Sequence, residues 1–238
     1  MNNEFLIVIS YYSGRSDSHL KKLLSDVSKA NQNIVVVINS DESIHEVRGF
    51  FNGCKTITRP NTGMNIGAWD SAYKHYPNFK YYIFLQDECV MTNADFISAY
   101  ASKLDIQGIG MIGESINYKW DKPWLEMMKS PLNYPVNIFQ NGKILSRVEY
   151  YLSLMRAWNI NPGVNGRHLR ALIWGFSGDV LRRIGGFPIG KTKEECIASE
   201  IAISKKIEQL GLKVVEIAEE PFKYFRHDEW REDGTHKK

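Results

Sequence analysis

Short apolar runs recur along the chain, and each is followed by polar residues. Such continuous runs are typical of strands that are buried on both faces of a parallel sheet. The runs that predict strands are Phe5–Ser10, Ile34–Ile38, Tyr81–Leu85, Ile109–Gly113 and Leu212–Ile217, with a further strand ending at Gly175-Phe176-Ser177-Gly178. Between the first two runs, Leu20, Leu23, Leu24 and Val27 recur at helical spacing. A strand, a helix and a strand in succession predict a βαβ unit and therefore a parallel sheet.

Four more helices are predicted between the later strands: Ala68–His75, a short helix ending near Leu104, Val148–Trp158, and Asp179–Ile184 followed by Gly185-Gly186. A last helix precedes the final predicted strand and has two possible starts. Thr192 and Glu195 have the spacing of a capping box, or Ser199 caps a shorter helix, Ile201–Leu210. Both starts place Glu200 in the first turns of this helix.

The region 114–170 is rich in tryptophan, tyrosine, asparagine and proline and has no recognisable motif, so its topology is not predicted. No repeat, low-complexity run or linker divides the chain. We therefore expect residues 1–238 to form a single α/β domain.

Composition and charge exclude some classes of protein. The 238 residues are 43% hydrophobic and 24% charged, as is usual for a soluble globular protein. A net charge of +3 does not favour a nucleic-acid partner, although it tolerates a small anionic ligand. The three cysteines lie far apart in the sequence, which suggests neither a zinc site nor a disulfide framework and favours a reducing compartment such as the cytosol. Neither a signal peptide nor an apolar run long enough to span a membrane is found, so a soluble, cytoplasmic protein is expected.

Two adjacent carboxylates, Asp87 and Glu88, come directly after the apolar strand Tyr81–Leu85. Ligands of open α/β sheets bind beyond the carboxyl ends of the strands. Carboxylate oxygens there suit Mg²⁺ or Mn²⁺. The alternative is a polar turn after the strand.

Polar residues also follow the first two strands, at Ser10–Gly14 and Asn39–Asp41, and would face the same edge of the sheet. Asp41 has the chemistry to accept hydrogen bonds from a base or ribose, or it simply forms a turn. The glycine-rich fingerprint of dinucleotide-binding dehydrogenases is missing after the first strand. An Asn-x-Gly pattern occurs twice, at Asn61-Thr62-Gly63 and Asn65-Ile66-Gly67, and such a segment either wraps a ligand or turns the chain.

The order of these features resembles the GT-A fold glycosyltransferases, in particular the large family 2 type. The resemblance covers roughly residues 5–217 and rests on four matches: the two N-terminal strands with polar ends, the Asn-Gly segment followed by Leu85-Gln86-Asp87-Glu88, the Gly178–Phe187 segment with its Gly-Gly-Phe, and Ser199-Glu200 before Ile201–Gly211. It implies a Rossmann-like domain with a mostly parallel sheet flanked by helices. Residues 1–110 would bind a nucleotide-sugar donor, and residues 111–238 would bind the acceptor and carry out catalysis.

The resemblance also implies an inverting, metal-dependent transfer of a sugar from a nucleotide-diphosphate donor to a hydroxyl of a glycan or polysaccharide. Glu200 matches the general base, with Glu194 and Glu195 as alternatives. Glu88, assisted by Asp87, matches the Mn²⁺ or Mg²⁺ ligands. His227 would be a third ligand, or else an unrelated surface histidine. The residues assigned to the nucleotide are Ser10, Tyr11, Asp41, Arg59, Asn61, Asn65, Gln86 and Asp87.

Further assignments stay open. Arg226 or Arg231 would meet phosphate oxygens. A tryptophan among Trp120, Trp124, Trp158 and Trp174 would stack on the acceptor sugar, or else pack in the core, and Trp69 and Asp70 receive no role.

Two residues depart from the family pattern. Gln86 stands where the metal motif has its first acid, and Ser199 replaces the first acid of the pair that ends in Glu200. Both departures support an alternative, a catalytically inactive nucleotide- or sugar-binding domain of the same fold. A nucleotidyltransferase is less favoured, because no glycine-rich, lysine-containing phosphate loop follows the first strand.

Overall fold

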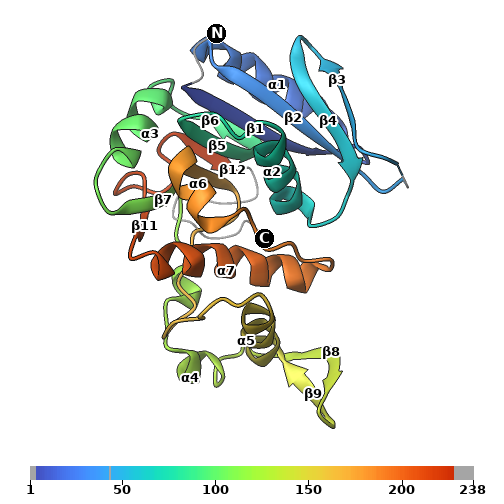
Figure 1. The fold of residues 1–238 in the computed structure, drawn as a ribbon, viewed down its shortest axis with the longest axis vertical. Helices are drawn as coiled ribbons and strands as arrows, with labels where there is room; N and C mark the ends of the chain where they lie inside the picture. Colours follow the sequence, from blue (N-terminus) through green and yellow to red (C-terminus); the bar gives the residue numbers. More distant parts are fainter. Residues whose placement is uncertain (1–3, 43, 228–238) are drawn as a thin grey trace.

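An eight-stranded sheet runs through the protein in the order β11-β7-β10-β5-β1-β2-β4-β3 (Figure 1). The computed structural model describes residues 4–42 and 44–227. The strands of this sheet are β1 (Phe5–Tyr12), β2 (Asn33–Ser40), β3 (Val47–Phe51), β4 (Cys54–Pro60), β5 (Tyr81–Gln86), β7 (Ile109–Gly113), β10 (Ile173–Ser177) and β11 (Lys213–Glu216). Strands β4, β2, β1 and β5 are parallel neighbours, β7 and β11 are parallel, and β10 and β3 run antiparallel. The prediction of an α/β fold with a mostly parallel central sheet is confirmed.

Alternation of side chains along the central strands divides the core into two layers. In β5, Tyr82 and Phe84 face one layer, whereas Tyr81, Ile83 and Leu85 face the other. This is the expected consequence of a strand whose successive side chains point to opposite faces. Because both faces of the sheet are covered, Tyr81–Leu85 are all apolar or aromatic. This continuous run is the pattern from which the strand was predicted.

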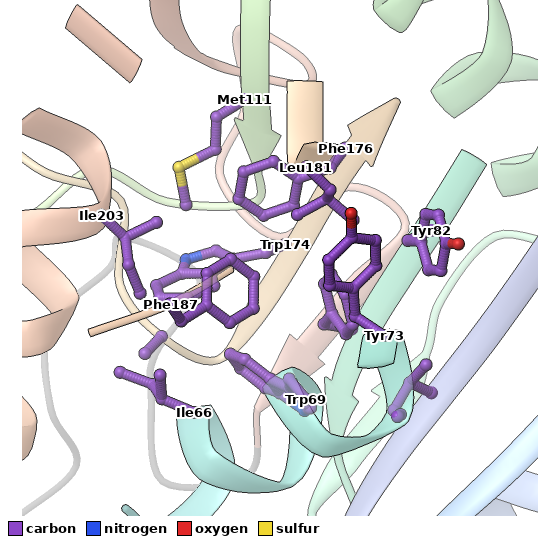
Figure 2. Packing of buried hydrophobic residues seen from close by; sticks show 14 of the residues in the cluster. Ile66, Trp69, Tyr73, Tyr82, Met111, Trp174, Phe176, Leu181, Phe187 and Ile203 are labelled. Carbon is purple, nitrogen blue, oxygen red and sulfur yellow. The ribbon is translucent and has the colours of Figure 1, made fainter. Parts of the chain in front are cut away.

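Helices cover both faces of the sheet. Helices α1 (Ser18–Val27) and α3 (Phe96–Leu104) pack on one face. Helices α2 (Met64–His75), α6 (Gly178–Ile184) and α7 (Lys193–Gln209) pack on the other. Figure 2 shows this second layer, in which the indole rings of Trp69 and Trp174 have centroids 5.0 Å apart. Both tryptophans are fully buried, so neither is available to stack on a sugar.

A smaller lobe lies on the far side of α7 from the sheet (Figure 1). It is built from α4 (Trp124–Met127), the hairpin β8 (Pro135–Gln140) and β9 (Lys143–Ser146), and α5 (Arg147–Ala157). Its apolar cluster includes Ala198, Ile201 and Ala202 of α7, while Ile203 and Ile207 of the same helix belong to the sheet core. Helix α7 therefore packs against the sheet on one side and against the lobe on the other.

Several elements differ from the predicted ones. Of the two predicted starts of the last helix, the one at Thr192 is confirmed, because its side chain accepts a hydrogen bond from the Glu195 backbone N–H. Ser199 is therefore not a cap, and Glu200 lies in the middle of α7 and not in its first turns. Helix α2 begins at Met64, four residues before the predicted start, which places Asn65-Ile66-Gly67 inside the helix. Strand β11 is not the last one, because β12 (Phe225–His227) follows and pairs with β6 (Cys89–Met91). Strands β3, β4, β8 and β9 and the short helices η1 (Ser28–Ala30) and η2 (Tyr118–Trp120) were not predicted.

The two glycines of the Asn-x-Gly pattern serve the backbone. Gly63 has φ +79°, a conformation that favours glycine, at the residue before α2. A Cβ on Gly67 would overlap the carbonyl oxygen of Thr62. The pattern therefore marks a tight entry into a helix.

Gly67→Ala is expected to lower the free energy of unfolding by about 1–3 kcal/mol, because the added methyl group meets a backbone atom. Chemical denaturation measures this change. Gly49→Ala on the exposed strand β3 is the control, since its Cβ would lie 3.1 Å from the movable Thr56 hydroxyl. Equal stability of Gly67→Ala and wild type would contradict the stated role of Gly67.

Candidate active site

A cavity of about 340 Å³ opens at the carboxyl ends of β1, β2 and β5. Parallel pairing of these three strands brings their polar ends to one edge of the sheet. The lining residues are Ser10, Tyr11, Tyr12, Arg15, Asn39, Asn61, Met64, Asn65, Gln86, Asp87 and Glu88. Six of the nucleotide-site residues named from the sequence are among them: Ser10, Tyr11, Asn61, Asn65, Gln86 and Asp87. We call this space the first cavity.

Glu88 lies between two basic side chains at the edge of the first cavity. Its Oε1 forms an ion pair with Arg15, and its Oε2 lies 3.4 Å from Nε2 of His227. The hydrogen bond from His227, followed by the charge of Arg15, lowers the pKa of Glu88. Glu88 is therefore a carboxylate held in its charged form.

His227 reaches this site from the far end of the described chain. It ends β12, whose pairing with β6 sets His227 opposite Cys89. The imidazole Nε2 also lies 3.1 Å from the amide oxygen of Gln86. His227 is only 1% exposed and is therefore not a surface histidine.

Asp87 is buried at the floor of the first cavity, with 6% of its surface exposed. Its backbone N–H donates to the carbonyl of Ser10, which fixes the end of β5 against the end of β1. Burial, and then the neighbouring charge of Glu88, raises the pKa of Asp87 to about 6. A bound cation would favour the ionised form of this carboxyl group.

The donor set at this edge fits a divalent cation. Glu88 and His227 offer a carboxylate oxygen and an imidazole nitrogen in contact with each other, and Mg²⁺ and Mn²⁺ commonly use few protein ligands together with substrate phosphates. Among residues 4–42 and 44–227, no group of three or more histidine, cysteine, aspartate or glutamate side chains is arranged to hold a metal ion. Because Glu88 and His227 are in contact, they are the two residues that would hold the ion, and Asp87 is the next residue along the cavity lining.

A second group of nucleotide-site residues lies at the outer rim. The carboxylate of Asp41 is exposed and does not line the first cavity, but it accepts hydrogen bonds from the Tyr12 hydroxyl and, at 3.1 Å, from the Asn61 amide. These two hydrogen bonds lower the pKa of Asp41.

Arg59 is also outside the lining. Its guanidinium donates to Oδ1 of Asn39 at 2.8 Å and to the Thr62 carbonyl at 2.9 Å. Arg59 therefore links the end of β2 to the loop before α2.

A second cavity of about 400 Å³ adjoins the first and shares Met64, Asn65 and Gln86 with it. Its other lining residues come from α2, η2 and the residue before it, α5, the segment before β10, and α7: Ile66, Asn117, Trp120, Arg147, His168, Arg170, Ala171, Leu172, Lys193, Cys196, Ile197 and Glu200. The amides of Asn65 and Gln86 both donate to the Ala171 carbonyl at 2.6 Å. These two side chains form the boundary between the cavities.

Glu200 faces the second cavity from the middle of α7. Its Oε1 accepts a hydrogen bond from the Ala171 backbone N–H at 2.8 Å and lies 3.5 Å from Nε2 of His168. Its Oε2 accepts no hydrogen bond from the described residues. Glu194 and Glu195 do not line either cavity, because they bond to Tyr151 and Tyr150 of the lobe.

Other residues named from the sequence have structural positions. Trp120 lines the second cavity, while the Trp124 indole donates to the carbonyls of Pro162 and Gly163. Asp70 is buried and accepts a hydrogen bond from the Phe187 backbone N–H at 2.8 Å. The remaining members of this group are Trp69, whose indole donates to the Leu85 carbonyl, Trp158, which packs on the lobe cluster, and Arg226, which lies in β12. Arg231 lies outside the described residues.

Sequence reasoning missed the basic side chains of both cavities. Arg15 follows β1 and carried a weak signal, since it stands in the polar loop after that strand. Arg147, His168, Arg170 and Lys193 line the second cavity without any motif that would have identified them.

Buried Glu114 fixes the segment that carries His227. Its carboxyl group accepts hydrogen bonds from the backbone N–H groups of Tyr224 and Phe225 and from the Tyr100 hydroxyl. Burial raises the pKa of Glu114 to about 7.

The folded protein therefore holds the Glu114 proton more tightly than the unfolded chain does, and we expect this group to lower the free energy of unfolding as pH rises from about 4.5 to about 7. The change is on the order of 3 kcal/mol. Glu114→Gln should flatten this part of the pH–stability curve, as measured by urea denaturation at each pH. An unchanged slope in the variant would contradict the role given to Glu114.

No protein-family model matches the chain, and no curated protein matches it. Among solved structures, the mannosyltransferase PcManGT from Pyrobaculum calidifontis, in complex with GDP-Man and Mn²⁺, is similar over 90% of this chain, with a TM-score of 0.52 and 12% identity. The chain covers 54% of that protein and so spans about half its length. TarS 1–349 from S. aureus is a weaker match, with a TM-score of 0.46, 12% identity, and coverage of 93% of this chain and 59% of that one.

The likeness to the mannosyltransferase concerns the fold. It agrees with the predicted α/β fold, in which helices flank a mostly parallel central sheet. Among the described residues, no helix combines the length and apolar character needed to cross a membrane.

Proposed function

We propose that this protein is an inverting glycosyltransferase that moves a sugar from a nucleotide-diphosphate donor to an acceptor hydroxyl of a glycan or polysaccharide. The observation that carries the proposal is the pair of adjoining cavities. One has acidic and polar side chains at the ends of parallel strands, and the other has Glu200 at its wall. A transfer reaction needs such an arrangement, because donor and acceptor must meet at a shared boundary.

The first cavity would hold the donor. Tyr12, Asn61 and the Asp41 that they bind lie at the outer rim, where they would meet the base or ribose. Arg15 lies beside Glu88, where its guanidinium would meet the diphosphate oxygens. All of these donor-site residues precede residue 110. Their positions support a donor-binding half within about residues 1–110 and an acceptor-binding half within about residues 111–238 of one domain.

Glu88 and His227, with Asp87 beside them, would hold Mn²⁺ or Mg²⁺ close to the diphosphate. The bound ion would supply Lewis-acid neutralisation of the charge that develops on the departing diphosphate. Support for a metal and for a nucleotide-sugar donor comes from the donor set itself and from the similar mannosyltransferase, which was solved with GDP-Man and Mn²⁺.

Glu200 would act as the general base. Its Oε1 is fixed by the Ala171 N–H, so Oε2 is the atom that would take the proton from the acceptor hydroxyl. The hydroxyl oxygen then bonds to the anomeric carbon as the bond from that carbon to the diphosphate breaks. Attack from the acceptor side, opposite the leaving diphosphate, inverts the anomeric configuration.

The second candidate is a catalytically inactive nucleotide- or sugar-binding domain. The observation that favours it is the hydrogen bond from the Ala171 backbone N–H to Glu200. In such a domain, Glu200 would serve only to hold the segment before β10 in place. Donor binding without turnover would be the result for such a domain.

A thermal-shift screen of nucleotide sugars and nucleoside diphosphates, with and without Mn²⁺, tests the donor assignment. We expect one nucleotide to raise the unfolding temperature only when Mn²⁺ is present, followed by release of the diphosphate in a turnover assay. Binding that is equally strong without metal would contradict the role of Glu88 and His227.

A further inference from the structure

We propose that the acceptor of this reaction carries an oxyanion, a carboxylate or a phosphate, next to the hydroxyl that receives the sugar. This inference rests on the proposed function, because it takes the second cavity as the acceptor site. Three side chains with fixed positive charge line this cavity, Arg147, Arg170 and Lys193, against a single carboxylate, Glu200. The excess of positive charge in the cavity lining, and the lack of an ion-pair partner for Lys193 among the described residues, support the proposal.

Arg147 is preorganised for an anion. Its guanidinium carbon lies 5.3 Å from the ring centre of Trp120 and 5.4 Å from that of Tyr151. Its Nε donates to the Tyr151 hydroxyl at 2.7 Å and lies 3.4 Å from Glu194. The ring of Tyr134 lies closest to the guanidinium carbon, at 5.0 Å, and the side chain of Arg147 is 13% exposed. Nη1 and Nη2 make no hydrogen bond to the described residues. A guanidinium held in this way binds planar oxyanions with two parallel hydrogen bonds.

Lys193 stands at the first position of α7, directly after the Thr192 cap. Helix dipoles favour anions and disfavour cations at this end, so the lysine is placed against the local field. Within the part of the chain that the structure describes, its ammonium group forms no ion pair. An anion in the second cavity would give Lys193 a counter-ion and would itself be stabilised by the helix end.

Arg170 differs from the other two cations. It is buried, and its Nη1 donates to the Ser115 hydroxyl and to the Ile116 carbonyl. The charge of Glu200 also acts on it. The charge of Glu216 acts on Arg170 as well, and Glu194 lies 3.4 Å from Nε of Arg147. The positive charge of Lys193 is left to attract a ligand.

Isothermal titration of the full chain with three small probes tests this proposal: methyl glucuronide for the carboxylate, glucose 6-phosphate for the phosphate, and methyl glucoside as the neutral control. We expect one anionic probe to bind at least tenfold more tightly than methyl glucoside, and the tighter of the two identifies the oxyanion. Raising the salt concentration should reduce this preference. Equal binding of the neutral probe, or no binding of either anionic probe, would overturn the proposal.

Lys193→Met should weaken the anionic probe about tenfold and leave the neutral probe unchanged. Lys191→Met is the matched control, since Lys191 is exposed two residues earlier and does not line the cavity. An equal loss in both variants would contradict the assigned site. Arg147→Gln gives a second test, with its unfolding temperature measured to show that the lobe is intact.

Nucleotide binding in the same samples separates the two proposals. Retained nucleotide binding without anion preference would overturn only the acceptor class. Anion preference without any nucleotide binding or turnover would overturn the proposed transferase.

Discussion

Glu200→Gln is expected to slow sugar transfer by about 10²–10⁴-fold, because the amide cannot take the proton from the acceptor hydroxyl. Glutamine keeps the size of the side chain, and its amide oxygen can still accept the hydrogen bond from the Ala171 N–H. Donor affinity and folding should therefore change little. The measurement is the rate of nucleoside diphosphate release in the presence of acceptor, with donor affinity determined by titration.

Glu195→Gln is the matched control for this experiment. Glu195 lies on the same helix, bonds to the Tyr150 hydroxyl and the Lys191 backbone N–H, and lines neither cavity. Transfer by Glu195→Gln should stay close to the wild-type rate. Unchanged turnover in Glu200→Gln would refute the base assignment, and a loss in Glu195→Gln instead would move that role to the start of α7.

Glu88→Gln is expected to abolish the dependence of donor binding on Mn²⁺ and to reduce transfer on the order of a hundredfold or more. The substitution removes the charge that would hold the ion and also leaves Arg15 without its ion-pair partner. Titrating the donor at a series of Mn²⁺ concentrations measures the effect. A chelator should reproduce it in the wild type.

Glu46→Gln is a suitable control for the loss of one carboxylate. Glu46 is partly exposed, pairs with His75, Ser71 and, at 4.0 Å, Arg59, and does not line the first cavity. Its donor binding should keep the wild-type metal dependence. If Glu88→Gln keeps that dependence as well, the ion binds elsewhere or is not used.

The sequence predicts the centre of the sheet well, because β1, β2 and β5 are buried on both faces and are therefore apolar throughout. The edge of the sheet is different. Strand β3 is mostly exposed, and β4 alternates lysine, threonine and arginine with apolar residues, so neither gives a continuous apolar run. The lobe was not predicted because its cluster forms only by packing on α7.

The candidate site shows the same contrast between parts that the sequence predicts and parts that it does not. Ser10 and Gln86, at the ends of central strands, were assigned to the nucleotide and do line the first cavity, as does Asn61 of the Asn-x-Gly pattern. Arg59 shows the limit of this reasoning, because its guanidinium turns behind the loop to bond with Asn39. Lys193 of α7 and Arg147 of α5 line the same cavity because the lobe packs on α7. No short-range spacing in the sequence predicts this packing.

The central claim is that donor and acceptor meet at the boundary between the two cavities with inversion at the anomeric carbon. Proton NMR of the wild-type protein incubated with a panel of nucleotide sugars, Mn²⁺ and candidate acceptor glycosides tests it most directly. We predict that one donor is consumed and that the new glycosidic bond has the anomeric coupling opposite to that of the donor. A product with the donor's own configuration, or no consumption of any donor, would contradict this account.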